Sequence, residues 1–224
     1  MGTVERGAAD ERRRFWRDAW ALAAGLLDRE PTDEVLAQLA PALDDLAARG
    51  QRVLGVRLTG TEFMSRALTE GAGGEAGART EYRALFFGPG KMPAPPWESV
   101  YLSPERLVMR EPAYQVLQSY AQAGLGYDGM TETPPDHVAR ELGFLAALAD
   151  PAVEVDQPEA KAAAFMRDHV ARWVPMFCRD VEHAVPGGFY AGLALLLREL
   201  VELGSPRLMQ VGTATGSLAS SPGQ

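Results

Sequence analysis

Apolar residues recur at every third or fourth position through most of this sequence, which is the spacing that places side chains on one face of an α-helix. Two stripes show the spacing clearly and are formed by Trp16, Trp20, Ala23 and Leu27 and by Leu36, Leu39, Leu43 and Leu46. No stretch alternates apolar and polar residues over the length of a strand. We therefore expect an all-α protein.

Capping residues, glycines and prolines divide this pattern into about nine helices. Thr32 is a good N-cap, Pro41 is expected to kink or split the helix that follows, and Gly50 is expected to end it. The last helix is apolar on most sides and is expected at the centre, and an irregularity is expected near Pro175. The expected helices cover residues 10–29, 32–50, 62–70, 80–87, 112–123, 133–149, 158–169, 171–184 and 189–203.

Two segments lack the bulky apolar side chains that would offset the entropy of ordering them. Residues 71–77 are glycine-rich and are expected to form a flexible linker, and residues 210–224 are expected to form a disordered tail. Exchange of the N-terminal helices through such a linker would give a swapped dimer, so a monomer and a domain-swapped dimer both stay open.

Charge and composition exclude several classes of protein. The net charge of −8 and the pI near 5.0 argue against nucleic acid as the main partner, because a phosphate backbone requires a basic patch. No apolar run approaches the roughly 18 residues that a membrane span requires. The single cysteine, Cys178, excludes an internal disulfide and is consistent with a reducing compartment.

The Arg-Arg-Arg-Phe-Trp run at residues 12–16 looks like a twin-arginine export signal. Asp18 interrupts the segment that should be apolar, and the first helical stripe starts at Trp16. We therefore interpret this run as part of an ordinary first helix.

Reactive side chains are few and lack the spacing of a site. The three histidines, His137, His169 and His183, and the lone Cys178 match no zinc or nucleophile pattern. The glycines at residues 71–77 lack the lysine and hydroxyl residue of a phosphate loop. We therefore expect no catalytic site, no metal and no cofactor, and a protein that is not an enzyme.

The segment EYRALFFGPGKMPAPPWESVYL, residues 81–102, begins like a helix and stops at a Gly-Pro pair. Three further prolines hold the chain extended, with Trp97 and Tyr101 near its end. Rigid aromatic groups on extended backbone suit a peptide-binding site. The alternative is a loop whose aromatic side chains pack down on the helices, and general physical reasoning favours that alternative.

A second segment, TPPDH at residues 133–137, predicts a helix start. With Thr133 as N-cap, Asp136 takes the third helical position, where an acidic residue completes a capping box. Capping alone therefore explains Asp136. His137 is expected on the first turn, where the helix dipole keeps it neutral, one turn before Glu141.

These segments resemble the TorD/DmsD family of cytoplasmic chaperones for molybdenum-containing oxidoreductases. The most specific element comprises Tyr82, Leu85, Phe86, Gly88, Pro89, Pro95, Pro96, Trp97, Ser99, Val100 and Tyr101. A second comprises Pro134, Asp136 and His137, and a third comprises His169, Trp173, Pro175, Phe177, Phe189 and Tyr190. The similarity covers residues 80–200 and is weak over the first 75.

The resemblance implies a single-domain, TorD/DmsD-like helical bundle over residues 1–209, located in the cytoplasm. Its implied partners are the twin-arginine leader and the body of an apo-molybdoenzyme catalytic subunit, held back from export until the molybdopterin cofactor is inserted. Two alternatives stay open. One is the maturation of a non-exported nitrate-reductase-type subunit, and the other is a helical scaffold or adaptor with no leader-binding role.

The leader-binding residues implied by the resemblance, with neighbours on the same segments, are Tyr82, Leu85, Phe86, Pro96, Trp97, Ser99, Tyr101, Asp136, His137 and Glu141. Counter-charges for the leader's arginines are expected from Glu81, Glu98, Asp136 and Glu141. Trp173, Phe177 and Phe189 are expected in the core. The loop before Trp97 is expected to form one half of a groove, and the helix start at Asp136 the other half.

Overall fold

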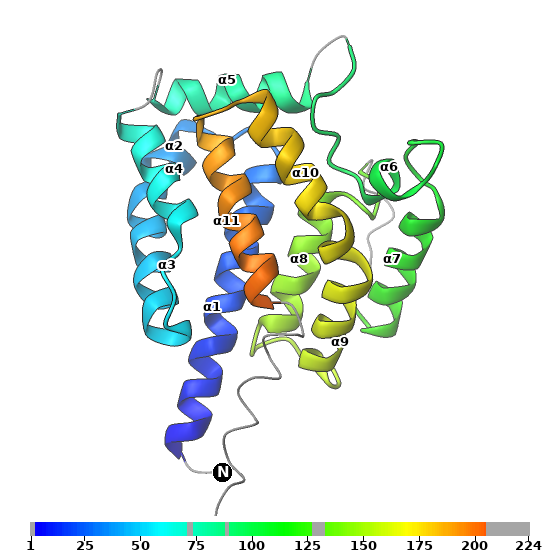
Figure 1. Cartoon of the computed structure of the whole chain (residues 1–224). Helices are drawn as coiled ribbons and strands as arrows, with labels where there is room; N and C mark the ends of the chain where they lie inside the picture. Colours follow the sequence, from blue (N-terminus) through cyan, green and yellow to red (C-terminus); the bar gives the residue numbers. More distant parts are fainter. Residues whose placement is uncertain (1–2, 71–73, 88–89, 127–132, 205–224) are drawn as a thin grey trace, which may run out of the picture.

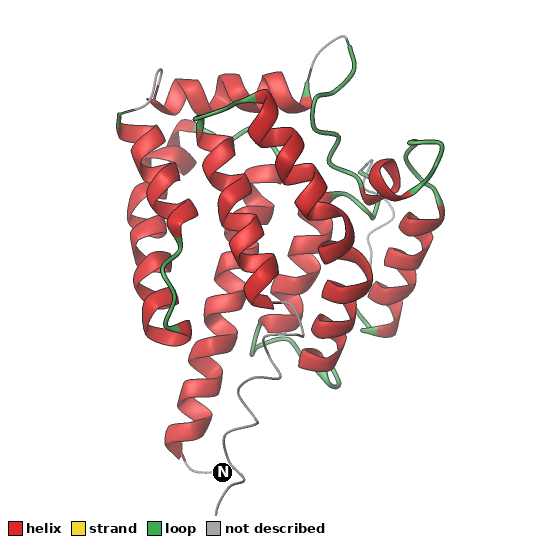
Figure 2. Ribbon diagram, in the orientation of Figure 1, coloured by secondary structure: helices red, strands yellow, loops and turns green. Residues whose placement is uncertain are grey.

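The computed structural model describes residues 3–70, 74–87, 90–126 and 133–204, and it confirms the prediction of an all-α protein (Figures 1 and 2). In chain order the elements are α1 (Thr3–Asp28), α2 (Asp33–Ala37), α3 (Leu39–Leu54), α4 (Thr59–Thr69), α5 (Gly74–Phe86), α6 (Glu98–Leu102), α7 (Glu111–Gln122), α8 (Val138–Ala149), α9 (Pro158–Phe165), the π-helical turn η1 (Met166–Val170), α10 (Ala171–Ala184) and α11 (Phe189–Gly204). Within these ranges, no helix is long and apolar enough to cross a bilayer.

The core forms where α1, α8 and α11 pack among the outer helices (Figure 1). α1 lies along α8, and α11 lies against α4 and α10. Most of α11 is buried, including Leu196 and Leu197, as its composition predicts. Trp173, Phe177 and Phe189 are buried as expected. Figure 1 shows α5 lying across one end of the bundle, with α6 and α7 at its side.

Two glycines allow α4 and α11 to approach each other closely. A Cβ atom at Gly60 would lie 2.3 Å from the backbone nitrogen of Leu196, and one at Gly192 would lie 2.9 Å from the backbone nitrogen of Met64. Both separations are shorter than a van der Waals contact, so the packing requires glycine at both positions. The α4–α11 pair contacts α5, the helix that leads into the first family motif.

Packing overrides two of the helix ends that the local sequence predicts. Gly50 does not end a helix: it lies buried inside α3, which continues to Gly55, whose φ of +70° lies in the left-handed region that favours glycine. The split expected near Pro41 occurs at Gln38, between α2 and α3. Pro41 therefore lies in the first turn of α3, where its missing N–H group is not needed.

Other elements also differ from prediction. α5 begins at Gly74, so part of the predicted linker is helical, whereas residues 71–73 and the predicted tail at 210–224 lie outside the described residues. α6 forms inside the segment that was expected to be extended. The irregularity expected at Pro175 lies one turn earlier, in the π-helical turn η1, which ends at Val170. Pro175 has no N–H group, so it cannot bond the carbonyl of Ala171, and the helix is irregular before it.

We predict that Gly60→Ala destabilises the protein by about 3 kcal/mol, because the new methyl group meets backbone rather than a movable side chain. Gly143→Ala is the matched control: it lies in α8 with no atom within 4 Å of the added carbon. There the better helix propensity of alanine should stabilise by up to about 1 kcal/mol. Urea unfolding of both variants measures the difference, and equal effects would show that the α4–α11 contact is looser than described.

Candidate functional site

Two segments that lie far apart in the sequence meet beside α6 and α8. They are residues 96–99 and 136–138, which we call the paired segments. An isolated antiparallel bridge and two backbone hydrogen bonds of 2.8 and 3.0 Å join them, and the longer bond runs from the N–H of Glu98 to the carbonyl of Asp136. The two segments that the sequence predicts as halves of one groove are therefore neighbours.

Asp136 has a different role from the predicted one. α8 begins at Val138, and its N-cap is His137, whose Nδ1 accepts a hydrogen bond from the N–H of Ala139 at 3.2 Å. The capping box expected from the sequence is therefore wrong. The fully buried carboxylate of Asp136 instead accepts hydrogen bonds from the backbone N–H of Ser99, at 2.8 Å, and from the Ser99 hydroxyl. This side chain fastens α6 to the start of α8.

His137 is buried beneath the indole of Trp97, with the two rings in an edge-on arrangement 5.6 Å apart. Burial is the largest cause that lowers the pKa of His137, to about 4, and Arg140 lowers it further, whereas Asp28 acts in the opposite direction. The imidazole is therefore neutral at neutral pH, as predicted, but burial rather than the helix dipole is the main cause. A neutral Nδ1 is what the N-cap hydrogen bond requires.

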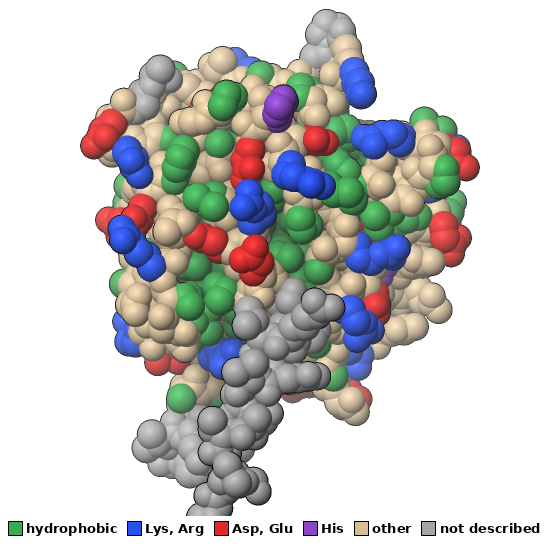
Figure 3. All heavy atoms as spheres, in the orientation of Figure 1, with side chains coloured by type: hydrophobic (Ala, Val, Ile, Leu, Met, Phe, Trp, Pro, Cys, Tyr) green, Lys and Arg blue, Asp and Glu red, His purple; other side chains and the backbone are tan. Residues whose placement is uncertain are grey.

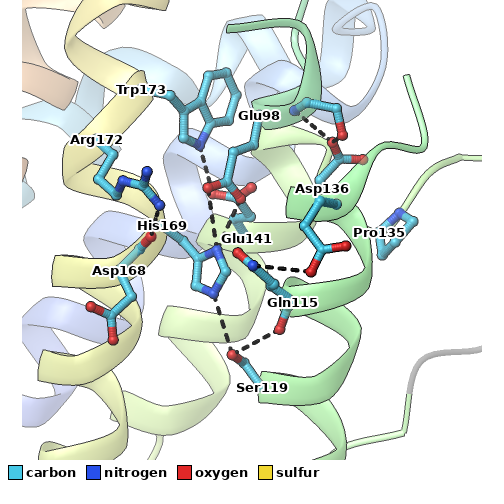
Figure 4. Close-up of polar contacts among 12 residues, drawn as sticks. Glu98, Gln115, Ser119, Pro135, Asp136, Glu141, Asp168, His169, Arg172 and Trp173 are labelled. Atoms are coloured by element: carbon cyan, nitrogen blue, oxygen red, sulfur yellow. Dashed lines mark hydrogen bonds and ion pairs between the residues drawn. The ribbon is translucent and has the colours of Figure 1, made fainter. Parts of the chain in front are cut away.

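A cluster of polar side chains lies directly behind the paired segments (Figure 4). Glu98 and Glu141 are fully buried, and Figure 4 shows their carboxyl groups close together. His169 Nδ1 lies 2.9 Å from Glu98 Oε2, and the Trp173 indole donates to Glu141 Oε2 at 2.9 Å. Burial, followed by the charge of Glu98, raises the pKa of Glu141 well above its usual value. Sequence motifs gave no sign that these four residues come together.

Most of the predicted leader-binding side chains are buried. The buried ones are Tyr82, Leu85, Phe86, Pro96, Ser99, Asp136, His137 and Glu141. Trp97 and Tyr101 keep partial exposure, and the Tyr101 hydroxyl donates to Asp180 at 2.9 Å. Most side chains of the two predicted segments therefore pack on the helices, which is the alternative that general physical reasoning favours for the loop before Trp97. In the described part of the two segments, Trp97, Tyr101 and prolines 95 and 134 are partly exposed, and Phe87, directly after α5, is 67% exposed.

The predicted counter-charges are not on the surface. Glu98, Asp136 and Glu141 have no exposed area. Glu81 is half-buried, and its carboxylate accepts hydrogen bonds from the backbone N–H groups of Phe189, at 3.2 Å, and of Tyr190. Each of the four acids is therefore either buried or already bound by the chain.

Two acidic residues that the sequence did not single out lie near predicted site residues. Asp28, the last residue of α1, and Glu30, two residues later, act with burial to raise the pKa of Tyr82 to about 12, and Asp28 alone also acts on His137. Both acids form ion pairs with arginines: Arg140 Nη2 lies 3.6 Å from Asp28 Oδ1, and Arg83 Nη2 lies 2.7 Å from Glu30 Oε1. On the face shown in Figure 3, acidic and basic side chains are likewise interspersed rather than gathered by sign.

A separate apolar hollow of about 90 Å³ lies between α1, α8 and α9, lined by Trp16, Trp20, Leu148 and Met166 among others. None of the predicted site residues lines it. Across the described ranges, no three His, Cys, Asp or Glu side chains converge as metal ligands would. Cys178 is fully buried, and burial raises the pKa of its thiol. The paired segments are therefore the candidate site.

We predict that the buried neutral His137 makes stability fall as the pH decreases from about 6.5 to about 4. In that window the unfolded chain binds a proton that the folded chain does not, so stability is lost as pH falls, by up to roughly 3 kcal/mol. His137→Asn keeps a capping oxygen but cannot titrate, so its pH dependence should be flatter. Urea unfolding at pH 7 and pH 5 tests this, with His183→Gln at an exposed histidine as control. If His137→Asn and wild type lost equal stability, the buried neutral state would be ruled out.

A sequence profile of the family described as nitrate reductase delta subunit matches residues 27–179. The chain is 30% identical over 116 residues to the Haemophilus influenzae protein named "Probable Tat proofreading chaperone DmsD", covering 52% of this chain and 54% of that protein. It is 27% identical over 135 residues to the chaperone protein TorD of Vibrio parahaemolyticus, covering 58% and 63%. The chain thus spans less than two thirds of the length of these two relatives.

A longer alignment joins the chain to the chaperone protein TorD of Escherichia coli, with 28% identity over 195 residues, 82% of this chain and 91% of that protein. Among solved structures, a protein from Archaeoglobus fulgidus assigned to redox enzyme maturation aligns with a TM-score of 0.52 and 21% identity, covering 83% of this chain and 93% of the other. That structure supports the fold, and the profile match covers more than half of the chain. The chain therefore belongs to the nitrate reductase delta subunit family, the TorD/DmsD family of redox-enzyme maturation chaperones.

Proposed function

We propose that this chain is a cytoplasmic chaperone that binds the twin-arginine leader and the apo form of a molybdenum-cofactor oxidoreductase subunit. It holds this client for cofactor insertion before export. The names of the relatives, a Tat proofreading chaperone and TorD chaperones, support this class of client. The chain acts by binding rather than by catalysis, as a monomer or a domain-swapped dimer.

The observation that carries the proposal is the position of Trp97 on the paired segments. Its backbone is fixed against the start of α8, and its indole stays partly exposed with prolines 95 and 134 nearby. The indole N–H of Trp97 is itself buried and has no hydrogen-bond partner in the described structure, so the exposed part of the side chain is ring surface. A rigid aromatic surface on fixed backbone suits the apolar segment of a peptide.

Asp28 and Glu30 are the acids best placed for the arginine pair of a leader. Their side chains keep 23% and 29% of their exposure, unlike the buried Glu98, Asp136 and Glu141. Both already pair with arginines of this chain, so a leader arginine would exchange with an internal partner. Such an exchange contributes more to specificity and association rate than to net affinity.

A second candidate is the maturation of a nitrate-reductase-type subunit that is not exported. The description of the matching family, nitrate reductase delta subunit, favours it. In that case the partner would be the folded body of the subunit, and a leader peptide alone would not bind. The two candidates share the chaperone class and differ in whether the leader is recognised.

We predict that Trp97→Ala weakens binding of the client's synthetic twin-arginine leader at least about 30-fold, the equivalent of roughly 2 kcal/mol for a buried aromatic anchor. Isothermal calorimetry measures the affinity. Tyr114→Ala is the matched control, because Tyr114 is an exposed aromatic residue, 56% accessible, on α7. It should leave the affinity unchanged.

A leader whose arginine pair is replaced by glutamine should also bind more weakly, with a loss that shrinks as salt is raised, because exposed charges are screened over about 10 Å at 0.1 M salt. Normal leader binding by Trp97→Ala would exclude the paired segments as the anchor. Failure of the wild type to bind any leader, together with binding of a leaderless nitrate-reductase-type subunit, would favour the second candidate. If neither the leader nor that subunit bound, a scaffold with no leader-binding role would remain.

A further inference from the structure

The cluster behind Trp97 holds two carboxyl groups with no exposed area, Glu98 from α6 and Glu141 from α8. Two buried carboxylates side by side repel each other at short range in a medium of low dielectric constant. Such pairs are stable when one proton is shared between them. The remaining partners show where that proton lies.

Glu98 faces a hydrogen-bond donor on its outer side. His169 Nδ1 lies 2.9 Å from Glu98 Oε2 and 3.3 Å from Oε1, so the imidazole donates to both oxygens. On the other side of the ring, Nε2 lies 3.4 Å from the Ser119 hydroxyl, whose own proton is directed to the carbonyl of Gln115. This contact is long, and the contact between Nδ1 and Glu98 is the shorter of the two. With the Nδ1–H directed at Glu98, the carboxylate of the pair is Glu98.

Glu141 lacks a cationic partner. Its Oε2 accepts from the indole N–H of Trp173 at 2.9 Å, whereas its Oε1 has no hydrogen-bond donor in the described structure. That oxygen is buried and is the natural position of a carboxylic acid proton directed at Glu98. Burial and the charge of Glu98 raise the pKa of this same Glu141 side chain.

We propose that Glu141, kept as a neutral acid, donates its proton to Glu98, and that this pair with His169 forms a latch that positions Trp97. The proposal rests on the proposed function of Trp97 in leader binding. It assigns no contact with the leader to Glu98, Glu141 or His169. They are positioning residues.

The latch acts on Trp97 through the chain itself. Glu98 directly follows Trp97 and is the first residue of α6, which has only five residues and cannot hold its own position. The latch ties that turn to α8 through Glu141 and to η1 through His169. A π-helical turn inserts one extra residue into a helix and often occurs at functional sites, which agrees with a histidine directed into this cluster.

The latch has a defined response to pH. The charged or titratable side chains that face Glu141 are Glu98 from α6 and Asp136 from the segment before α8, and His169 from η1 completes the group beside Glu98. Both neighbours of Glu141 are acidic, so its ionisation adds a like charge to the cluster. Raising the pH should therefore loosen α6 and shift Trp97, and no other change in the protein is required.

Two replacements at one position separate the latch from simple packing. Glu141→Gln keeps a buried N–H donor in place of the acid proton, and Glu141→Leu fills the same volume without a donor. We expect Glu141→Gln to bind the leader within about twofold of wild type, and Glu141→Leu and Glu98→Gln to bind at least about tenfold more weakly. Asp168→Asn, at an exposed acid of η1, controls for loss of charge near the cluster.

Two readouts do not depend on the leader. The first is the indole ¹H–¹⁵N signal of Trp97, assigned by its absence in Trp97→Phe. It should move with rising pH in wild type, stay fixed in Glu141→Gln, and be displaced in Glu141→Leu. The second is the infrared carbonyl band of a protonated carboxylic acid, which should be present in wild type at neutral pH and absent in Glu141→Gln, even if the other variants fold poorly.

The latch is overturned if the acid band persists in Glu141→Gln, or if Glu141→Gln displaces the Trp97 signal as far as Glu141→Leu does. If wild type binds no leader but the band and the signal behave as expected, the proposed function fails and the latch stands. If the leader binds equally well to Glu141→Gln and Glu141→Leu, Trp97 needs no positioning and the inference fails while the proposed function stands.

Discussion

The contact between Asp136 and Ser99 is the interaction on which the site depends. A carboxylate with no exposed area accepts hydrogen bonds from the backbone and the side chain of one residue, and in doing so joins α6 to the entry of α8. Hydrogen bonds to a charged group contribute about 1.5–3 kcal/mol, and a buried charge left without them is strongly destabilising. Because α6 has only five residues, its position and that of Trp97 depend on this contact and on the neighbouring latch rather than on helix propensity.

Several polar side chains are buried around this contact. Glu98, Glu141 and His169 would be replaceable by apolar residues of similar volume if stability alone mattered, because paired buried charges recover little more than their desolvation cost. Their geometry instead favours one position of α6 over its alternatives, since only one arrangement satisfies the donors and acceptors together. The same segment carries the one motif tryptophan that remains accessible.

Much of the fold follows from the sequence, because helical periodicity depends on local spacing. The burial of α11 and of Trp173 follows from apolar composition alone. The role of Asp136 does not, because a capping box and a buried tertiary contact present the same residue types at the same spacing. Glu98 and Glu141 are acidic residues, which are almost always exposed, so no local pattern marks them as buried. The proximity of Asp28 to the site arises from packing of α1 along α8, a contact between distant parts of the chain.

The central claim is that the paired segments form one unit and that the leader binds there. Hydrogen exchange with and without the client's leader tests it most directly, read at the backbone amides of Glu98, Ser99 and Val138, which donate across the pair. We predict that these three amides exchange with one common opening free energy and that the leader slows all three together. Independent exchange of the three amides, or protection that appears instead around the apolar hollow near Trp16, would contradict it.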